Sequence, residues 1–236
     1  MDKSVLEEYI NQFEVFESEV NYGFKNICLH YSINILTIGR EAPLNTTPEF
    51  WNNTIFNLTT VAILTLGRIF DLDAKFSVHK LLNILGQNIE ILSLTELRTR
   101  KENIDFEEYV EGKVDFNKEM YRELVNRKKT LLKQYESTYK VYRNSIIGHR
   151  LVKNLVEIDT NNEFKYMDIL NMYIALYNLK RELWERYHNG RVTKNLTFEK
   201  LTSQIYSLEK SEDRTPIYLH MARDYLKIYN LLKEHG

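Results

Sequence analysis

Cysteine, proline and glycine are all scarce in this chain of 236 residues. The single Cys28 excludes an intramolecular disulfide and any metal site built from several cysteines. Only three prolines and eight glycines interrupt the chain, which is too few for many short strands joined by turns. The many Leu, Ile, Glu, Lys and Tyr residues favour long helices instead.

A dominant charge is also missing, because 32 Lys and Arg stand against 33 Asp and Glu, for a formal net charge of -1. Any surface for a nucleic acid must therefore be a local patch. A hydrophobic content of 43% is ordinary for a folded domain of this length. We predict an all-α fold: a single domain over residues 1–236, an up-and-down helical bundle with long helices, with an acidic insertion near 102–115 and a C-terminal helical extension from about 190.

The chain shows no strong sign of secretion or of a membrane anchor. Its first residues run into an acidic amphipathic stretch, which is unlike a signal peptide. Residues 54–70 are largely apolar, but this segment is short for a span and carries Asn57, Thr59, Thr60 and Thr65, so a buried helix is favoured. We expect a cytoplasmic protein with no membrane partner.

Apolar residues recur every three or four positions along most of the chain, as on one face of a helix. Ser77 is expected to cap a helix that Gly86 closes, and Pro48 to occupy the first turn of another. His30 and His79 are expected to be ordinary surface histidines. The predicted helices lie at about residues 4–38, 48–71, 78–85, 88–101, 117–146, 165–188, 198–208 and 216–232.

Charge is unevenly distributed, since residues 118–153 hold ten Lys or Arg against three Glu. Such a run is usually a solvated helix face, but this one also indicates an anionic polymer as partner. Arg68 either pairs locally with Asp71, three residues on, or reaches the same groove. The candidate RNA-binding residues are Arg127, Lys128, Lys133, Lys140, Arg150 and Arg68.

The most specific constellation is Arg143-Asn144 followed by four residues and His149. A guanidinium can hold a phosphate and an imidazole can move a proton. On a regular helix a step of six residues turns the two side chains about 120° apart, so their convergence needs a distortion, expected near Gly148. No glycine-rich phosphate loop or helical zinc motif occurs, and nothing nominates a serine nucleophile, although a Ser-His-Asp arrangement is not excluded.

This pattern resembles the Rx4–6H signature of the HEPN superfamily, with Asn144 at the polar position after the arginine. The flanking residues 139–150 look like the AbiU2-type branch. So does an earlier block, Gly67-Arg68-Ile69-Phe70-Asp71 with Ser77-Val78-His79-Lys80-Leu81-Leu82. The resemblance implies a metal-independent endoribonuclease that works as a homodimer, often as a toxin or an abortive-infection effector. It leaves open an antitoxin or nucleotidyltransferase partner.

The candidate catalytic residues suit cleavage of RNA by its own 2′-hydroxyl. His149 can act as base or acid, Arg143 can grip the phosphate, and Asn144 can orient the imidazole or bind a phosphate oxygen. No cofactor and no metal is expected. Two other functions stay open: a non-catalytic helical dimer that binds RNA or a partner protein, and a small-ligand-binding helical domain. In a purely structural alternative, His149 caps or packs a helix end, and Arg143 pairs with Glu136 or another carboxylate.

Overall fold

The computed structural model describes residues 3–38, 42–101, 106–144, 166–191, 194–209 and 215–235. Every regular element in these ranges is a helix, and none of the described residues forms a strand. The predicted all-α class, with several long helices packed together, is confirmed. His149 and Arg150 lie outside the described residues, as does Gly148, where the distortion was expected.

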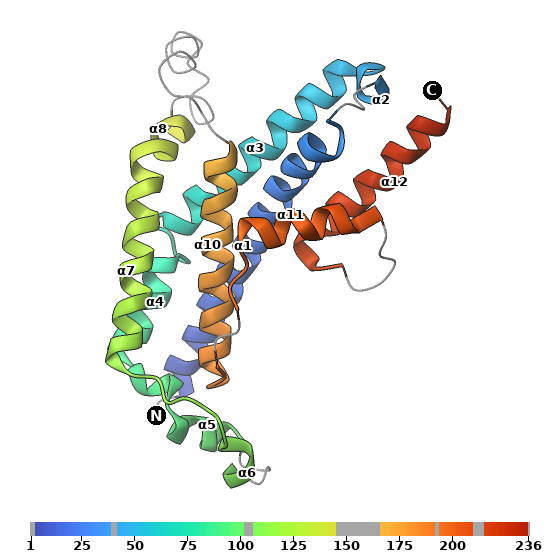
Figure 1. The fold of residues 1–236 in the computed structure, drawn as a ribbon. Coiled ribbons are helices and arrows are strands. Elements are labelled where there is room, and N and C mark those ends of the chain that lie inside the picture. The colour runs from blue at the N-terminus through green and yellow to red at the C-terminus, as the bar shows by residue number, and fades with distance from the viewer. Residues whose placement is uncertain are drawn as a thin grey trace.

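Three long helices form the centre of the molecule: α1 (Lys3–Leu36), α3 (Pro48–Phe70) and α10 (Tyr166–Tyr187). α1 packs along both α3 and α10, and the three cross behind one another in Figure 1. Their bounds agree with the predicted helices to within a few residues. Apolar side chains of all three are buried, so the repeated apolar face is what joins them.

α3 passes from the outer end of the molecule into its core. Pro48 starts the helix after Thr47, and the short helix α2 (Ala42–Asn45) precedes it. By length and composition α3 is the one described helix that is apolar enough to cross a membrane, and half of its most apolar window is buried inside the fold. A core helix passes the same test, and α3 packs along α1.

α4 (Val78–Gln87) begins where expected, because the Ser77 side chain accepts a hydrogen bond from the backbone N–H of Lys80. The prediction that Gly86 closes this helix is wrong, since the helix continues through it. A Cβ at Gly86 would stand 2.1 Å from the hydroxyl of Tyr121. This glycine is therefore explained by the close approach of a tyrosine from the next long helix.

The predicted helix at 88–101 is divided in two, a 3-10 turn η1 (Ile89–Leu92) and α5 (Leu94–Arg100). Ser93 caps α5 by accepting from the N–H of Glu96, and a residue that caps one helix cannot continue the previous one. The short α6 (Phe106–Val110) follows within the acidic stretch. α5 and α6 lie at the lower end of the bundle in Figure 1.

The basic segment forms one long rod beside α4 and α10 (Figure 1). It starts as α7 (Lys118–Gln134), which Asn117 caps, widens into a π-helix η2 (Tyr135–Tyr139) and continues as α8 (Lys140–Tyr142). Arg143 and Asn144 are again π-helical. The visible departure from regular α-helix therefore begins at Tyr135, before the arginine of the motif, and recurs at the arginine itself.

The last elements pack against the C-terminal part of α1 and the N-terminal part of α3. They are α11 (Phe198–Tyr206), the 3-10 turns η5 (Ser207–Glu209) and η6 (Ile217–Leu219), and α12 (His220–His235). Besides the main core, a second apolar cluster forms here, which we call the arm cluster. Its buried members are Leu29, Ile33, Trp51, Leu58, Tyr225 and Tyr229.

Candidate functional site

The described half of the sequence motif lies at the end of the basic rod. Arg143 and Asn144 follow α8, and Nε of Arg143 donates a hydrogen bond to Oδ1 of Asn144 at 3.0 Å. Glu136 pairs with Lys140, whose Nζ is 3.6 Å from its carboxylate. The structure thus brings Arg143 and Asn144 together, while the position of His149 relative to them falls outside the described residues.

Arg143 rests on the last turn of α3, at a residue that has no side chain. A Cβ built on Gly67 would stand 2.7 Å from Nη1 of Arg143 and 2.8 Å from its Cδ. Any larger residue at position 67 would occupy the space that the arginine fills. The Arg143 side chain therefore packs directly on Gly67, and we call this contact the seat of the guanidinium. Gly67 belongs to the block that resembled the AbiU2-type branch.

Tyr135 lies at the same seat. Its ring stacks on Phe70 with centroids 5.4 Å apart, and its hydroxyl oxygen is 3.3 Å from the Cβ position of Gly67. Burial raises the pKa of the Tyr135 hydroxyl, an effect that Arg143 opposes and Asp71 reinforces. At neutral pH this residue is a protonated phenol beside the motif arginine.

A buried histidine lies close to this group, in α4. His79 is 7% exposed, so the prediction of a surface histidine is wrong. Its Nδ1 is 3.1 Å from Nζ of Lys128, and because an ammonium only donates, Nδ1 is the acceptor. Burial first, and Lys128 second, lower the pKa of His79, which keeps the imidazole neutral.

The predicted RNA-binding cations divide into tethered and outward-facing ones. Lys128 is held by His79, Arg127 pairs with Glu182 of α10, and Lys140 pairs with Glu136. Lys133 is exposed and has no carboxylate partner among the residues that the structure describes. Further exposed cations stand on the same rod, namely Lys118, Arg122 and Lys129. A basic surface remains even after the tethered side chains are set aside.

Arg68 bonds to α1 and not to Asp71, the local partner predicted for it from the sequence. Its Nε and Nη2 both donate to the carboxylate of Glu19 on α1, at 2.8 to 3.0 Å, and Nη2 also donates to Thr65. The predicted local pair with Asp71 is wrong, because α3 ends at Phe70 and Asp71 has extended backbone. Asp71 instead accepts from the backbone N–H of Asp73.

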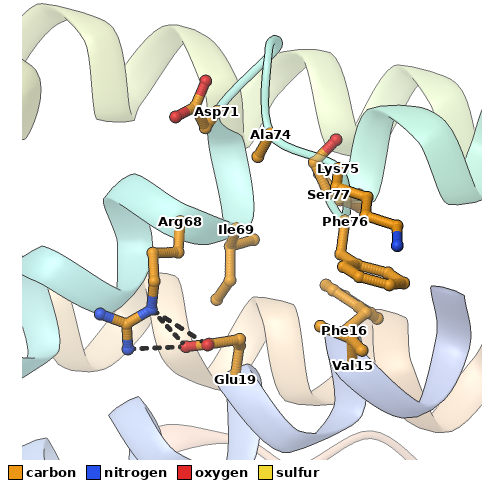
Figure 2. A pocket seen from close by; sticks show the side chains of 11 residues that line it. Val15, Phe16, Glu19, Arg68, Ile69, Asp71, Ala74, Lys75, Phe76 and Ser77 are labelled. Carbon is orange, nitrogen blue, oxygen red and sulfur yellow. Dashed lines mark hydrogen bonds and ion pairs between the residues drawn. The ribbon is translucent and has the colours of Figure 1, made fainter.

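The Arg68–Glu19 pair borders a cavity of about 240 Å³ between α1 and the loop after α3. Figure 2 shows this pair at one side of the cavity, Phe16 and Phe76 at the other, and Asp71 apart from both. Gly67 meets Arg143, whereas its neighbour Arg68 turns to α1. The cavity and the seat of Arg143 are therefore on different faces of the same helix.

Sequence reasoning missed Gly67 and Tyr135. Tyr135 is one of sixteen tyrosines and fits the apolar stripe of its helix, so its position alone gave no signal. A glycine inside an apolar helix often marks a close approach of another group, and Gly67 was a signal that could have been used. In the described part of the chain, no three His, Cys, Asp or Glu side chains gather as a metal site would require.

Comparison with known proteins assigns the chain to a family. The model of the HEPN_AbiU2 family, described as AbiU2, matches residues 6–204, a span that holds both the Gly67 block and the Arg143 motif. No curated protein and no solved structure matches the chain. Since the matched span covers most of its 236 residues, the chain belongs to the AbiU2 branch of the HEPN superfamily.

Proposed function

We propose that this protein is a metal-independent endoribonuclease, acting in the cytoplasm as a toxin or defence effector and assembled as a homodimer. Family membership supports the reaction class, and the observation that carries the proposal is the seat of Arg143. A guanidinium bonded to Asn144 at the end of a basic rod is placed to hold a phosphate. The exposed cations of α7 continue this surface for the flanking RNA.

The reaction that fits these residues is attack of the RNA 2′-hydroxyl oxygen on the adjacent phosphorus. A base takes the 2′-hydroxyl proton as the new P–O bond forms, and the 5′-oxygen leaves with a proton from an acid. The products are a 2′,3′-cyclic phosphate and a 5′-hydroxyl end. Arg143 stabilises the charge that develops on the phosphorane oxygens.

His149 supplies one proton-transfer group, whereas the reaction needs two. We therefore place the second histidine in the partner copy, with two motifs facing one groove of a two-fold dimer. The reference pKa of histidine, about 6.5, suits a base in one copy and an acid in the other. Each chain then contributes half of the catalytic pair.

The first experiment compares wild type with His149→Ala and Arg143→Ala on a structured RNA in EDTA. Two controls are available away from the basic rod, both on α12: exposed His220→Ala and exposed Lys227→Ala. We expect wild type and both controls to leave 2′,3′-cyclic phosphate ends, with cleavage by the two motif variants reduced by about 100-fold or more. Equal cleavage by all five proteins would reject the motif as the site.

A non-catalytic RNA-binding dimer is the competing outcome of the same experiment. The exposed cations of α7 favour salt-dependent binding whether or not the chain cuts. If no protein cleaves but wild type binds RNA with a steep salt dependence, a non-catalytic RNA-binding dimer replaces the nuclease as the proposed function.

Subunit mixing tests the shared groove. Wild type and His149→Ala are mixed in equal amounts and allowed to exchange subunits, and the cleavage rate is compared with that of the unmixed wild type. If two histidines serve one groove, only wild-type homodimers cut, and about a quarter of the activity per total protein remains. Independent sites would leave about half.

A further inference from the structure

The hydroxyl of Tyr135 is a buried polar group without a partner. Tyr135 is 3% exposed, and no hydrogen-bond acceptor or donor meets its oxygen among the described residues. Burying an unpaired hydroxyl lowers the stability of a folded protein. Such groups are uncommon in native structures, and one beside a candidate site suggests that its partner arrives with a ligand.

The unpartnered hydroxyl and the motif arginine lie against the same point. The Cβ position of Gly67 is 3.3 Å from Oη of Tyr135 and 2.7 Å from Nη1 of Arg143. The two atoms can be no further apart than these two distances together allow, yet no hydrogen bond joins them. Since a guanidinium has only donors, an anion that enters here can accept from both.

The π-helix explains how residues eight positions apart reach one seat. On a regular helix, residue 143 would lie about 80° further round the axis than residue 135. The wider turn at Tyr135–Tyr139 takes up one extra residue and removes most of that rotation. π-Helical turns inside α-helices are frequent at functional sites, and this one aligns Tyr135 with Arg143.

The ring of Tyr135 is fixed while the arginine can move. The phenol is stacked on Phe70 and buried, whereas Arg143 is half-buried and reaches the seat through a flexible side chain. When the guanidinium turns toward a bound phosphate, it vacates space above Gly67 next to the phenol. Burial also keeps the phenol protonated by raising its pKa, so that the hydroxyl remains a donor.

We propose that Tyr135 is a further catalytic residue, which donates its hydroxyl hydrogen to a non-bridging oxygen of the RNA phosphate that Arg143 holds. This inference rests on the proposed nuclease function. The two donors form a phosphate site that spans the π-helix, with Gly67 as its floor. Because a phosphorane carries more negative charge on these oxygens than the ground state, the hydroxyl contributes most in the transition state.

The test uses Tyr135→Phe, which keeps the ring and its contact with Phe70 and removes only the oxygen. Tyr225→Phe is the matched control, because the Tyr225 hydroxyl is also buried and unpartnered but belongs to the arm cluster. Full-length proteins are compared for kcat and KM on RNA, and for binding to a 2′-O-methyl copy that cannot be cleaved. We expect kcat of Tyr135→Phe to fall about 100-fold with a smaller change in KM, and Tyr225→Phe to stay within about twofold of wild type.

Each outcome decides the proposal separately from the nuclease function. If wild type cuts RNA and Tyr135→Phe cuts equally well, the Tyr135 proposal is overturned while the nuclease function stands. If wild type does not cut, the nuclease function fails, and weaker binding of the 2′-O-methyl RNA by Tyr135→Phe than by Tyr225→Phe still supports the phosphate contact. In that case, equal binding of the 2′-O-methyl RNA by the two variants, or no binding by wild type, overturns the proposed contact between Tyr135 and the phosphate.

Discussion

The two ends of α3 are built from similar residues but have different surroundings. At the outer end, Trp51 packs edge-on against Tyr225, with ring centroids 5.5 Å apart, inside the apolar arm cluster. At the inner end, Phe70 stacks on Tyr135, and an arginine lies beside them on Gly67. Both ends bury a tyrosine hydroxyl without a partner, but only the inner end adds a cation at a basic surface. Aromatic packing therefore serves stability at one end and, in our proposal, holds a phosphate site at the other.

Truncating a buried side chain at the outer end of α3 should change only the stability of the fold. This is the largest effect that we expect. Trp51→Ala is expected to lower the free energy of unfolding by about 3–5 kcal/mol, because it removes a buried aromatic side chain. Chemical denaturation measures this loss, with the neighbouring exposed Phe50→Ala as control. RNA cleavage per folded molecule should stay at the wild-type level. A loss of cleavage in folded Trp51→Ala would mean that the arm takes part in the site.

Adding one methyl group at the inner end of α3 should instead lower cleavage without lowering the stability of the fold. Gly67→Ala is expected to lower cleavage by roughly 30-fold, about 2 kcal/mol, because the new Cβ displaces Arg143. Stability should hold or rise, since the displaced atoms belong to a flexible side chain and alanine favours helix by about 1 kcal/mol over glycine. Steady-state cleavage and thermal unfolding separate the two effects.

Gly86→Ala is the matched control for this substitution. A Cβ there meets the Tyr121 ring instead of the arginine, so stability should change and cleavage per folded molecule should not. Full activity in Gly67→Ala would contradict the seat that we assign to Arg143.

A histidine between the two ends should make the fold sensitive to acid. Burial lowers the pKa of His30 to about 4, against about 6.5 in an unfolded chain. Between these values the unfolded state binds a proton that the folded state does not, so stability falls as the pH drops. We expect a loss of about 2 kcal/mol between pH 7 and pH 5, measured by urea unfolding.

His30→Asn is the comparison that isolates this effect. Thr59 donates its hydroxyl hydrogen to the carbonyl of Ile55, so the neutral imidazole donates from Nδ1 to the Thr59 oxygen, which is 2.8 Å away. An asparagine amide can keep that donor without titrating. If the dependence on pH remains in His30→Asn, other groups cause it.

The smallest effect is expected on the face of α3 that turns to α1. Arg68→Gln removes a pair with Glu19 in which the arginine is half-exposed, so solvent screening limits the loss of stability to about 1 kcal/mol or less. Cleavage should change by less than about twofold, because Arg68 is held away from Arg143. Glu19→Gln should behave alike in unfolding. A large drop in cleavage for Arg68→Gln alone would place this arginine at the RNA.

The helices were predictable because their apolar residues repeat at helical spacing over long stretches. α1, α3 and α10 begin and end within a few residues of their predicted bounds. The errors lie where a contact between distant segments decides. Gly86 looked like a helix end, but it makes room for Tyr121, and Arg68 bonds to Glu19, 49 residues earlier in the chain.

At the candidate site, the sequence indicated which residues to examine but not how they are placed. The Arg143-Asn144 pair was predicted and is found hydrogen-bonded, whereas Gly67 and Tyr135 could only be recognised once α3 and the rod were seen to meet. A π-helix has no distinctive composition, since the segment Tyr135–Tyr139 reads as ordinary helix. The roles of His149 and Arg150 remain predictions from the sequence.

The π-helix also makes the spacing along the rod as important as the residues on it. One widened turn amounts to one surplus residue in an otherwise regular helix. Deleting exposed Ser137 would remove this surplus and let the rod close into regular α-helix, with Arg143 at nearly its present angle around the axis. Inserting one residue there would instead turn Arg143 by about 100° and away from Gly67, although every side chain of the motif would be kept. The length of this segment therefore decides, as much as its side chains do, whether the arginine reaches α3.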